Sequence, residues 1–192
     1  MWARILSEAG ARVSENVFLR DTALPSIEAS DGRRLEVVAT GLPVHRGVPL
    51  GVDVTMVSPL HMKGEPWARA DSVAGTAIRR AERDKRSTYR DLVGSPVLRP
   101  TTVACEVGGR WSQDTADLIE SLVGAKSRSA APRLRSSMVV AYRRRWWSLL
   151  SLVAQDALAS TLVDDALVLL DGRDGVEPLV CDVLADAAAC GL

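Results

Sequence analysis

Apolar residues along the chain recur with two spacings, one typical of helices and one typical of strands. A spacing of three or four positions, which makes one helix face apolar, marks several segments. The predicted helices cover residues 1–13, 72–91, 113–125 and 136–163. Short apolar runs bounded by turn-forming residues mark the strands. The predicted strands cover residues 16–20, 34–40, 49–58 and 97–107.

The order of these elements predicts a mixed α/β fold. Helix, three strands, helix, strand and two helices follow one another along the chain. Residues 41–48, between the second and third strands, contain the glycines and the proline that favour a hairpin connection. We therefore expect a mixed four-stranded sheet flanked by helices, with a C-terminal helical extension. The predicted domain spans residues 1–163, and residues 164–192 form a predicted acidic C-terminal tail.

Two acidic residues stand at matching places on the two hairpin strands. If the turn centres between Val44 and His45, an antiparallel register sets Glu36 directly opposite Asp53. Carboxylates so close repel each other unless a cation lies between them or one is protonated. A solvated strand face would explain the pair without any function. Both strands are otherwise apolar, however, and a buried unpaired carboxylate is costly, so the pattern predicts a divalent-metal site.

The helix predicted after the hairpin carries a lysine that could join the acidic pair. Glu82, Lys85 and Tyr89 fall on one helical face, with Arg86 beside them. A solvent-facing helix with ion pairs along it explains the same charges. If the helix instead packs beside the hairpin, Lys85 reaches the metal site. There it can orient or deprotonate an attacking water and stabilise charge on a phosphoryl oxygen.

Charge is unevenly distributed along a chain whose formal net charge is zero. Residues 164–192 hold seven acids against Arg173 alone, a net charge of −6, so residues 1–163 carry +6. The segment from Lys126 to Arg145 contains seven basic residues and no acid. A basic body can bind a polyanion, and we hypothesise that the acidic tail competes for the same surface. The predicted phosphate contacts are Arg110, Arg133, Arg135, Arg143, Arg144 and Arg145.

Some of these residues also have a purely structural interpretation. The arginines at 143–145 could form a solvated helix face, and Trp146 beside them lies on the apolar stripe, where we expect core packing. Glu106 and Arg110 flank a glycine pair that permits a tight turn at a strand end. Glu106 could instead support the acidic pair from the neighbouring strand.

Cysteine and histidine usage narrows the class of protein. The three cysteines are an odd number without a C-x-x-C pair, which favours reduced thiols in an intracellular protein. With only two histidines, a Cys/His zinc module is not expected. No apolar run is long enough to span a bilayer, and no signal-peptide core follows the N-terminus, so we expect a soluble protein without membrane contact.

Four motifs in order resemble one known domain. They are an acid in a short strand (Glu36), the Asp-Val-Thr-Met-Val-Ser strand from Asp53, a helical Lys-x-x-x-Tyr from Lys85 to Tyr89, and an apolar strand ending in Gly-Gly-Arg-Trp. Over roughly residues 1–160 the chain resembles the restriction-enzyme-like endonuclease at the C-terminal end of site-specific non-LTR retrotransposon polyproteins. That domain is a member of the PD-(D/E)XK nuclease superfamily.

The resemblance implies a restriction-endonuclease-like core and a DNA endonuclease dependent on Mg²⁺ or Mn²⁺. Such an enzyme nicks target DNA to prime reverse transcription. The match assigns Glu36 and Asp53 as metal ligands, Lys85 as the catalytic lysine and Tyr89 as its support. It implies DNA as the partner, the element's RNA as a second partner, and a nuclear location if the source is a eukaryotic retroelement.

The chain also departs from the family pattern. Leu35 and Glu36 stand where the family has Pro and Asp, and Thr55 occupies the commonest lysine position of the superfamily. Two alternatives therefore stay open. One is a catalytically inactive nucleic-acid-binding relic of such a domain, and the other is a junction-resolving nuclease of the same superfamily.

Overall fold

The computed structural model describes residues 1–22, 24–25, 27–61 and 63–171. The chain divides into two compact units, Met1–Ala154 and Gln155–Leu192. The first unit contains the whole sheet and every residue of the candidate site. In the described part of the chain, no helix combines the length and apolar character needed to cross a bilayer.

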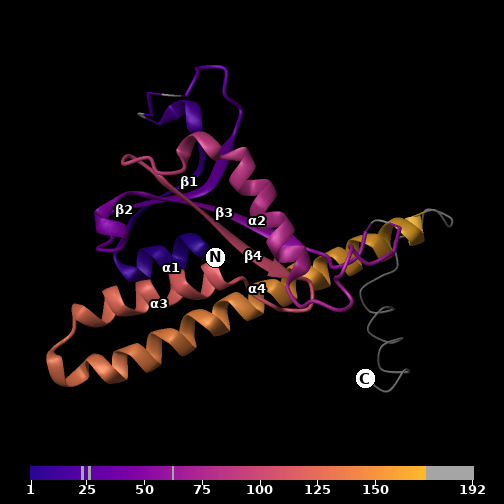
Figure 1. The fold of residues 1–192 in the computed structure, drawn as a ribbon. Coiled ribbons are helices and arrows are strands. Elements are labelled where there is room, and N and C mark those ends of the chain that lie inside the picture. The colour runs from indigo at the N-terminus through magenta and orange to yellow at the C-terminus, as the bar shows by residue number, and fades with distance from the viewer. Residues whose placement is uncertain (23, 26, 62, 172–192) are drawn as a thin grey trace. The chain divides into compact units, whose positions relative to one another are not determined.

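A four-stranded mixed sheet forms the centre of the first unit (Figure 1). The strands are β1 (Arg12–Phe18), β2 (Arg34–Thr40), β3 (Leu50–Val57) and β4 (Arg99–Glu106). They lie side by side in chain order. β2 is antiparallel to both β1 and β3, and β4 is parallel to β3. A parallel return needs a crossover, which α2 (Thr76–Thr88) supplies. The predicted mixed four-stranded α/β fold is therefore confirmed.

Helices cover both faces of this sheet. Figure 1 shows α2 on one side of the strands, and α1 and α3 on the other. The remaining helices are α1 (Trp2–Ala9), α3 (Gln113–Arg128) and α4 (Arg135–Asp171). The larger core lies between the sheet and α1, α3 and the start of α4, and it buries Trp146 completely, as predicted.

A smaller core on the other face of the sheet holds α2 in place. Tyr89 and Leu92, just after α2, pack there with Leu35 of β2 and Leu98, which precedes β4. Burying an aliphatic or aromatic side chain of this size contributes about 2 kcal/mol. The end of α2 is therefore attached to the same strands that carry the acidic pair.

Element boundaries differ from the predicted ones where a local turn intervenes. The first helix ends at Ala9, not at residue 13, because Gly10 adopts the left-handed conformation (φ 108°) that terminates helices. The predicted first strand is present but its bounds of 16–20 are wrong, since β1 begins at Arg12 and ends at Phe18, where a short 3₁₀ turn follows. In α2 the positive φ of Gly75 delays the start of the helix.

The C-terminal helix is longer than predicted. α4 continues to Asp171, so the predicted boundary between residues 163 and 164 falls inside it. Residues 172–192, which make up most of the predicted acidic tail, lie outside the described residues. The tail's proposed competition for the basic surface stays a prediction.

Candidate functional site

Strands β2 and β3 bring Glu36 and Asp53 together. Their ladder pairs Val37 with Val52 and Ala39 with Leu50, so Glu36 and Asp53 occupy the next facing positions of the same register. The Glu36 carboxylate also accepts a hydrogen bond from the backbone N–H of the residue after Asp53. The predicted facing pair is confirmed.

The acidic pair lies in an environment that disfavours two negative charges. Asp53 is 3% exposed. Burial raises the pKa of Glu36 above its usual value, and the Asp53 carboxylate raises it further, against the opposing hydrogen bond from Val54. Glu36 and Asp53 therefore need a proton or a cation to share the site.

Lys85 supplies one of the missing positive charges. Its Nζ donates a hydrogen bond to Asp53 Oδ1 over 3.1 Å, and the same nitrogen lies 2.9 Å from Oδ2. Oδ1 therefore accepts the hydrogen bond from Lys85, and buried Oδ2 is held against the same ammonium by the ion pair. The prediction that α2 packs beside the hairpin and brings Lys85 to the pair is confirmed.

Tyr89 completes the cluster from the end of α2. Its ring is buried, and its hydroxyl donates a hydrogen bond to the carbonyl oxygen of Arg34 over 3.1 Å. Burial, followed by the charges of Asp53 and Glu36, raises the pKa of Tyr89 to about 12. The phenol therefore stays protonated and fixes β2 two residues before Glu36.

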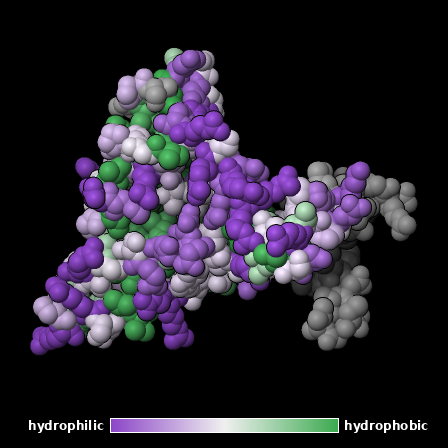
Figure 2. All heavy atoms as spheres, in the orientation of Figure 1, coloured by the Kyte–Doolittle hydropathy of each residue, from purple (hydrophilic) through white to green (hydrophobic). Residues whose placement is uncertain are grey.

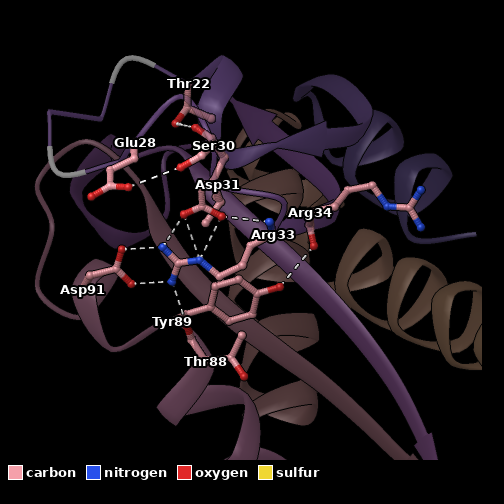
Figure 3. A network of polar contacts seen from close by, with 10 residues as sticks. Thr22, Glu28, Ser30, Asp31, Arg33, Arg34, Thr88, Tyr89 and Asp91 are labelled. Carbon is pink, nitrogen blue, oxygen red and sulfur yellow. Dashed lines mark hydrogen bonds and ion pairs between the residues drawn. The ribbon is translucent and has the colours of Figure 1, made fainter.

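An arginine that sequence reasoning missed ties the same two elements together (Figure 3). The Arg33 guanidinium makes two hydrogen bonds to the Asp91 carboxylate, over 2.6 and 2.7 Å. It also donates to Asp31 over 2.7 Å and to the carbonyl of Thr88 over 2.6 Å. These bonds lower the pKa values of both Asp31 and Asp91. The end of α2 is thus clamped to the start of β2, a contact between residues 58 positions apart that no sequence pattern signalled.

Glu106 does not join the acidic pair. Glu106 faces Val57 in the parallel ladder, whereas Asp53 faces Thr102, four residues earlier on the same strand. Four residues of strand span about 13 Å. Glu106 instead lies 3.5 Å from its own ion-pair partner, Arg110. The prediction that it supports the pair is wrong, and the strand-end interpretation applies.

Most of the predicted phosphate-binding arginines already have partners within the chain. Arg143 forms a 2.6 Å ion pair with Glu120, and Arg145 forms a 2.7 Å pair with Glu8. The side chain of Arg135 donates to a backbone carbonyl over 3.3 Å. Arg133 and Arg144 are exposed. The structure therefore neither gathers these arginines around the acidic pair nor tests their contact with phosphate.

The Glu36–Asp53 pair has features that suit a hard divalent cation. In the part of the chain that the structure describes, no group of three or more His, Cys, Asp or Glu side chains is arranged to hold a metal by itself. Mg²⁺ does not require such a group, because it usually takes one or two carboxylates together with waters and substrate phosphates. The buried carboxylate of Asp53 and the raised pKa of Glu36 both fit such an ion.

Comparison with known proteins adds no further assignment. No protein-family model matches the chain, and no curated protein matches it. The functional inference therefore depends on the cluster of Glu36, Asp53, Lys85 and Tyr89, which the structure brings together as the sequence predicted. The catalytic roles of these four residues stay predictions.

Proposed function

We propose that this protein is a metal-dependent DNA endonuclease with a restriction-endonuclease-like core, derived from the endonuclease domain of a non-LTR retrotransposon. The observation that carries the proposal is the meeting of Glu36, Asp53 and Lys85, contributed by three separate elements, at one buried point. The order of helix, three antiparallel strands, crossover helix and parallel strand supports the proposed core.

Glu36 and Asp53 are the residues that would hold Mg²⁺ or Mn²⁺. When bound there, the ion would polarise a phosphoryl oxygen and lower the pKa of a coordinated water. Support comes from the chain itself, because the Asp53 carboxylate is buried and Glu36 beside it has a raised pKa. A buried pair with a single lysine as its compensating cation is still short of one positive charge.

Lys85 and Tyr89 have distinct tasks in this proposal. In the hydrolysis a water oxygen bonds to phosphorus, the bond from phosphorus to the bridging ester oxygen breaks, and a proton goes to the departing oxygen. The Lys85 ammonium, 33% exposed, is placed to stabilise the negative charge that develops on the phosphoryl group. Tyr89 is a positioning residue, because its hydroxyl holds the backbone carbonyl of Arg34, two residues before Glu36.

Nicking of supercoiled plasmid tests the proposal. Wild-type protein should nick with Mg²⁺ or Mn²⁺ and lose the activity with a chelator, and Asp53→Ala should abolish it. A matched control is Asp84→Ala, which removes an acid that is 75% exposed on α2 and should leave nicking unchanged. Equal nicking by wild type and Asp53→Ala would show that the activity comes from another source and would overturn the proposal.

One observation favours the alternative of an inactive nucleic-acid-binding relic. Lys85 already lies at hydrogen-bond distance from Asp53, so part of the charge at the site is balanced by the protein itself. A relic would bind duplex DNA with steep salt dependence but would never nick it with either metal. A plasmid assay and a salt titration of binding, performed on one preparation, separate the two functions.

A further inference from the structure

A groove beside Lys85 is lined by both basic and acidic side chains. Its volume is about 870 Å³, and it lies within the first unit, between the end of α2, the start of β4 and α3. Figure 2 shows that the surface over α2 is mostly hydrophilic. The basic residues that line the groove, besides Lys85, are His45, Arg46, Arg86 and Arg99, and the acidic ones are Glu82, Asp114 and Asp117.

The arginines of the groove differ from several other arginines of the first unit. Arg33, Arg143 and Arg145 each form an ion pair with a carboxylate. Among the described residues, Arg86 and Arg99 form no such ion pair, and neither does Arg46. After burial, the positive charge of Arg99 is the second cause that lowers the pKa of His45. Cations without an ion-pair partner on a concave wall can attract anions.

The edge of β4 adds a backbone donor to the groove. Alternate residues of an edge strand direct their N–H and C=O groups outward. At Ala104 both groups are used, since its N–H donates to Thr115 and its carbonyl accepts from Ser112. Two residues earlier, Thr102 has the same outward orientation and lines the groove. Backbone N–H groups are common phosphate contacts.

The size of the groove selects the kind of nucleic acid. A volume of about 870 Å³ is that of a typical small-molecule pocket, enough for one or two nucleotides. A space of this volume is too small to contain a double helix. The mixture of basic and acidic side chains matches a nucleotide. Its phosphate is anionic, and the amino groups of its base can donate hydrogen bonds to carboxylates.

We propose that this groove binds an unpaired nucleotide segment of the DNA substrate, next to the phosphate that is cut. The phosphates lie along Arg86 and Arg99 with the N–H of Thr102, and base amino groups face Asp114 and Asp117. Lys85 lines the groove and pairs with Asp53, so it connects the groove to the acidic pair. The position of the cut phosphate therefore rests on the proposed endonuclease function. Branched or flapped DNA is then a better substrate than a continuous duplex.

Binding and cleavage are tested separately. Binding of a fluorescent six-nucleotide single strand to the Asp53→Asn protein is measured by anisotropy without metal. Adding Arg86→Gln and Arg99→Gln should weaken it at least tenfold. The matched control adds Arg12→Gln in β1 and Arg20→Gln in the 3₁₀ turn that follows β1, which remove the same charge at the opposite edge of the sheet and should weaken it less than twofold. Equal weakening by both pairs would overturn the groove assignment.

Cleavage of flapped and continuous duplexes by otherwise wild-type protein completes the test. The groove variants should lose the preference for the flapped substrate, and the β1 control should keep it. Absence of any cleavage, with single-strand binding still dependent on Arg86 and Arg99, would overturn the proposed endonuclease but support the groove. Asp53-dependent cleavage without a flap preference in wild type would overturn the groove proposal alone.

Discussion

Lys85 Nζ lies 2.9 Å from Asp53 Oδ2, although the two residues are 32 positions apart and belong to different elements. The lysine thus reaches the carboxylate from the helix that covers β3, whereas the position two residues after Asp53 is Thr55. The position of the Lys85 charge therefore depends on how α2 packs against the sheet. The interactions that hold α2 against β2 should therefore affect activity as well as stability.

Removing the Lys85 charge should impair both nicking and folding. Lys85→Met leaves the Asp53 carboxylate without its ion-pair partner, which should lower the free energy of unfolding by about 1–3 kcal/mol, because the lysine is one-third exposed. Denaturant unfolding measures the loss. The double variant Lys85→Met, Asp53→Asn should recover part of it, and Lys63→Met is the control for an exposed lysine. No recovery in the double variant would show that the two side chains do not interact.

Neutralising Glu36 should stabilise the metal-free protein while abolishing activity. The pKa of Glu36 is raised in the folded state by burial and by Asp53. Its contribution to stability is therefore fully present below the unfolded value of 4.5 and is lost as the pH rises through the folded value. Glu36→Gln should accordingly be more stable than wild type at pH 7, and the difference should shrink toward pH 4. Thermal unfolding at both pH values tests this, and a less stable variant at pH 7 would contradict it.

Magnesium binding should stabilise the wild type but not the Glu36→Gln variant. A ligand that binds only the folded state raises its stability in proportion to the logarithm of ligand concentration. We expect Mg²⁺ to raise the melting temperature of wild type at pH 7, less at pH 5, where protons compete for Glu36, and not at all in Glu36→Gln. Identical shifts in wild type and variant would place the ion elsewhere.

Glu8 should make the fold sensitive to acid. It accepts hydrogen bonds from Arg145 and from the indole of Trp146, which joins α1 to α4. The Arg145 bonds are the main reason that the pKa of Glu8 falls from 4.5 to about 2. This contribution is present above pH 4.5 and is lost as the pH falls toward 2. Glu8→Gln should cost about 1–2 kcal/mol at pH 7 and flatten the acid limb of the stability curve, whereas Glu15→Gln should not.

Arg33 should behave as a positioning residue. Arg33→Ala releases Asp31 and Asp91 and loosens the end of α2, so stability should fall by about 1–3 kcal/mol. Nicking should fall through kcat more than through KM, because the lysine is displaced while the groove arginines remain. Arg33→Lys keeps the charge but not the two-pronged geometry and should recover only part of kcat. Arg83→Ala, on the exposed side of α2, should leave both quantities unchanged.

The hairpin and its acids could be predicted from sequence because both signals are local. Alternation along each strand and the centre of one short turn determine that Glu36 faces Asp53, and the structure has this register. The position of Lys85 beside the acidic pair could be predicted from the helical spacing of Lys85 and Tyr89 and from the order of the elements. The error at β1 arose because Gly10 ends α1 early, which moves the strand toward the N-terminus.

The rest of the site depends on contacts that no local pattern contains. Arg33 forms an ion pair with Asp91, 58 residues later in the chain, and in sequence both look like ordinary surface charges. The groove is assembled from four separate segments, and Arg46, Arg86 and Arg99 share no spacing. In contrast, the run Arg143–Arg145 predicted phosphate contacts, but Arg143 and Arg145 form ion pairs within the fold.

The pattern of backbone groups along β4 also bears on whether a second copy could add a strand at this edge of the sheet. The N–H of Arg99 points inward to Pro49, so the next residue, Pro100, has its nitrogen on the outer edge, where no ladder bond is lost. A strand from a second copy that approached this edge would find no donor at Pro100 and both groups of Ala104 already occupied. Only Thr102 could pair with it. The edge is therefore open enough for a short ligand and too discontinuous to nucleate sheet-to-sheet aggregation.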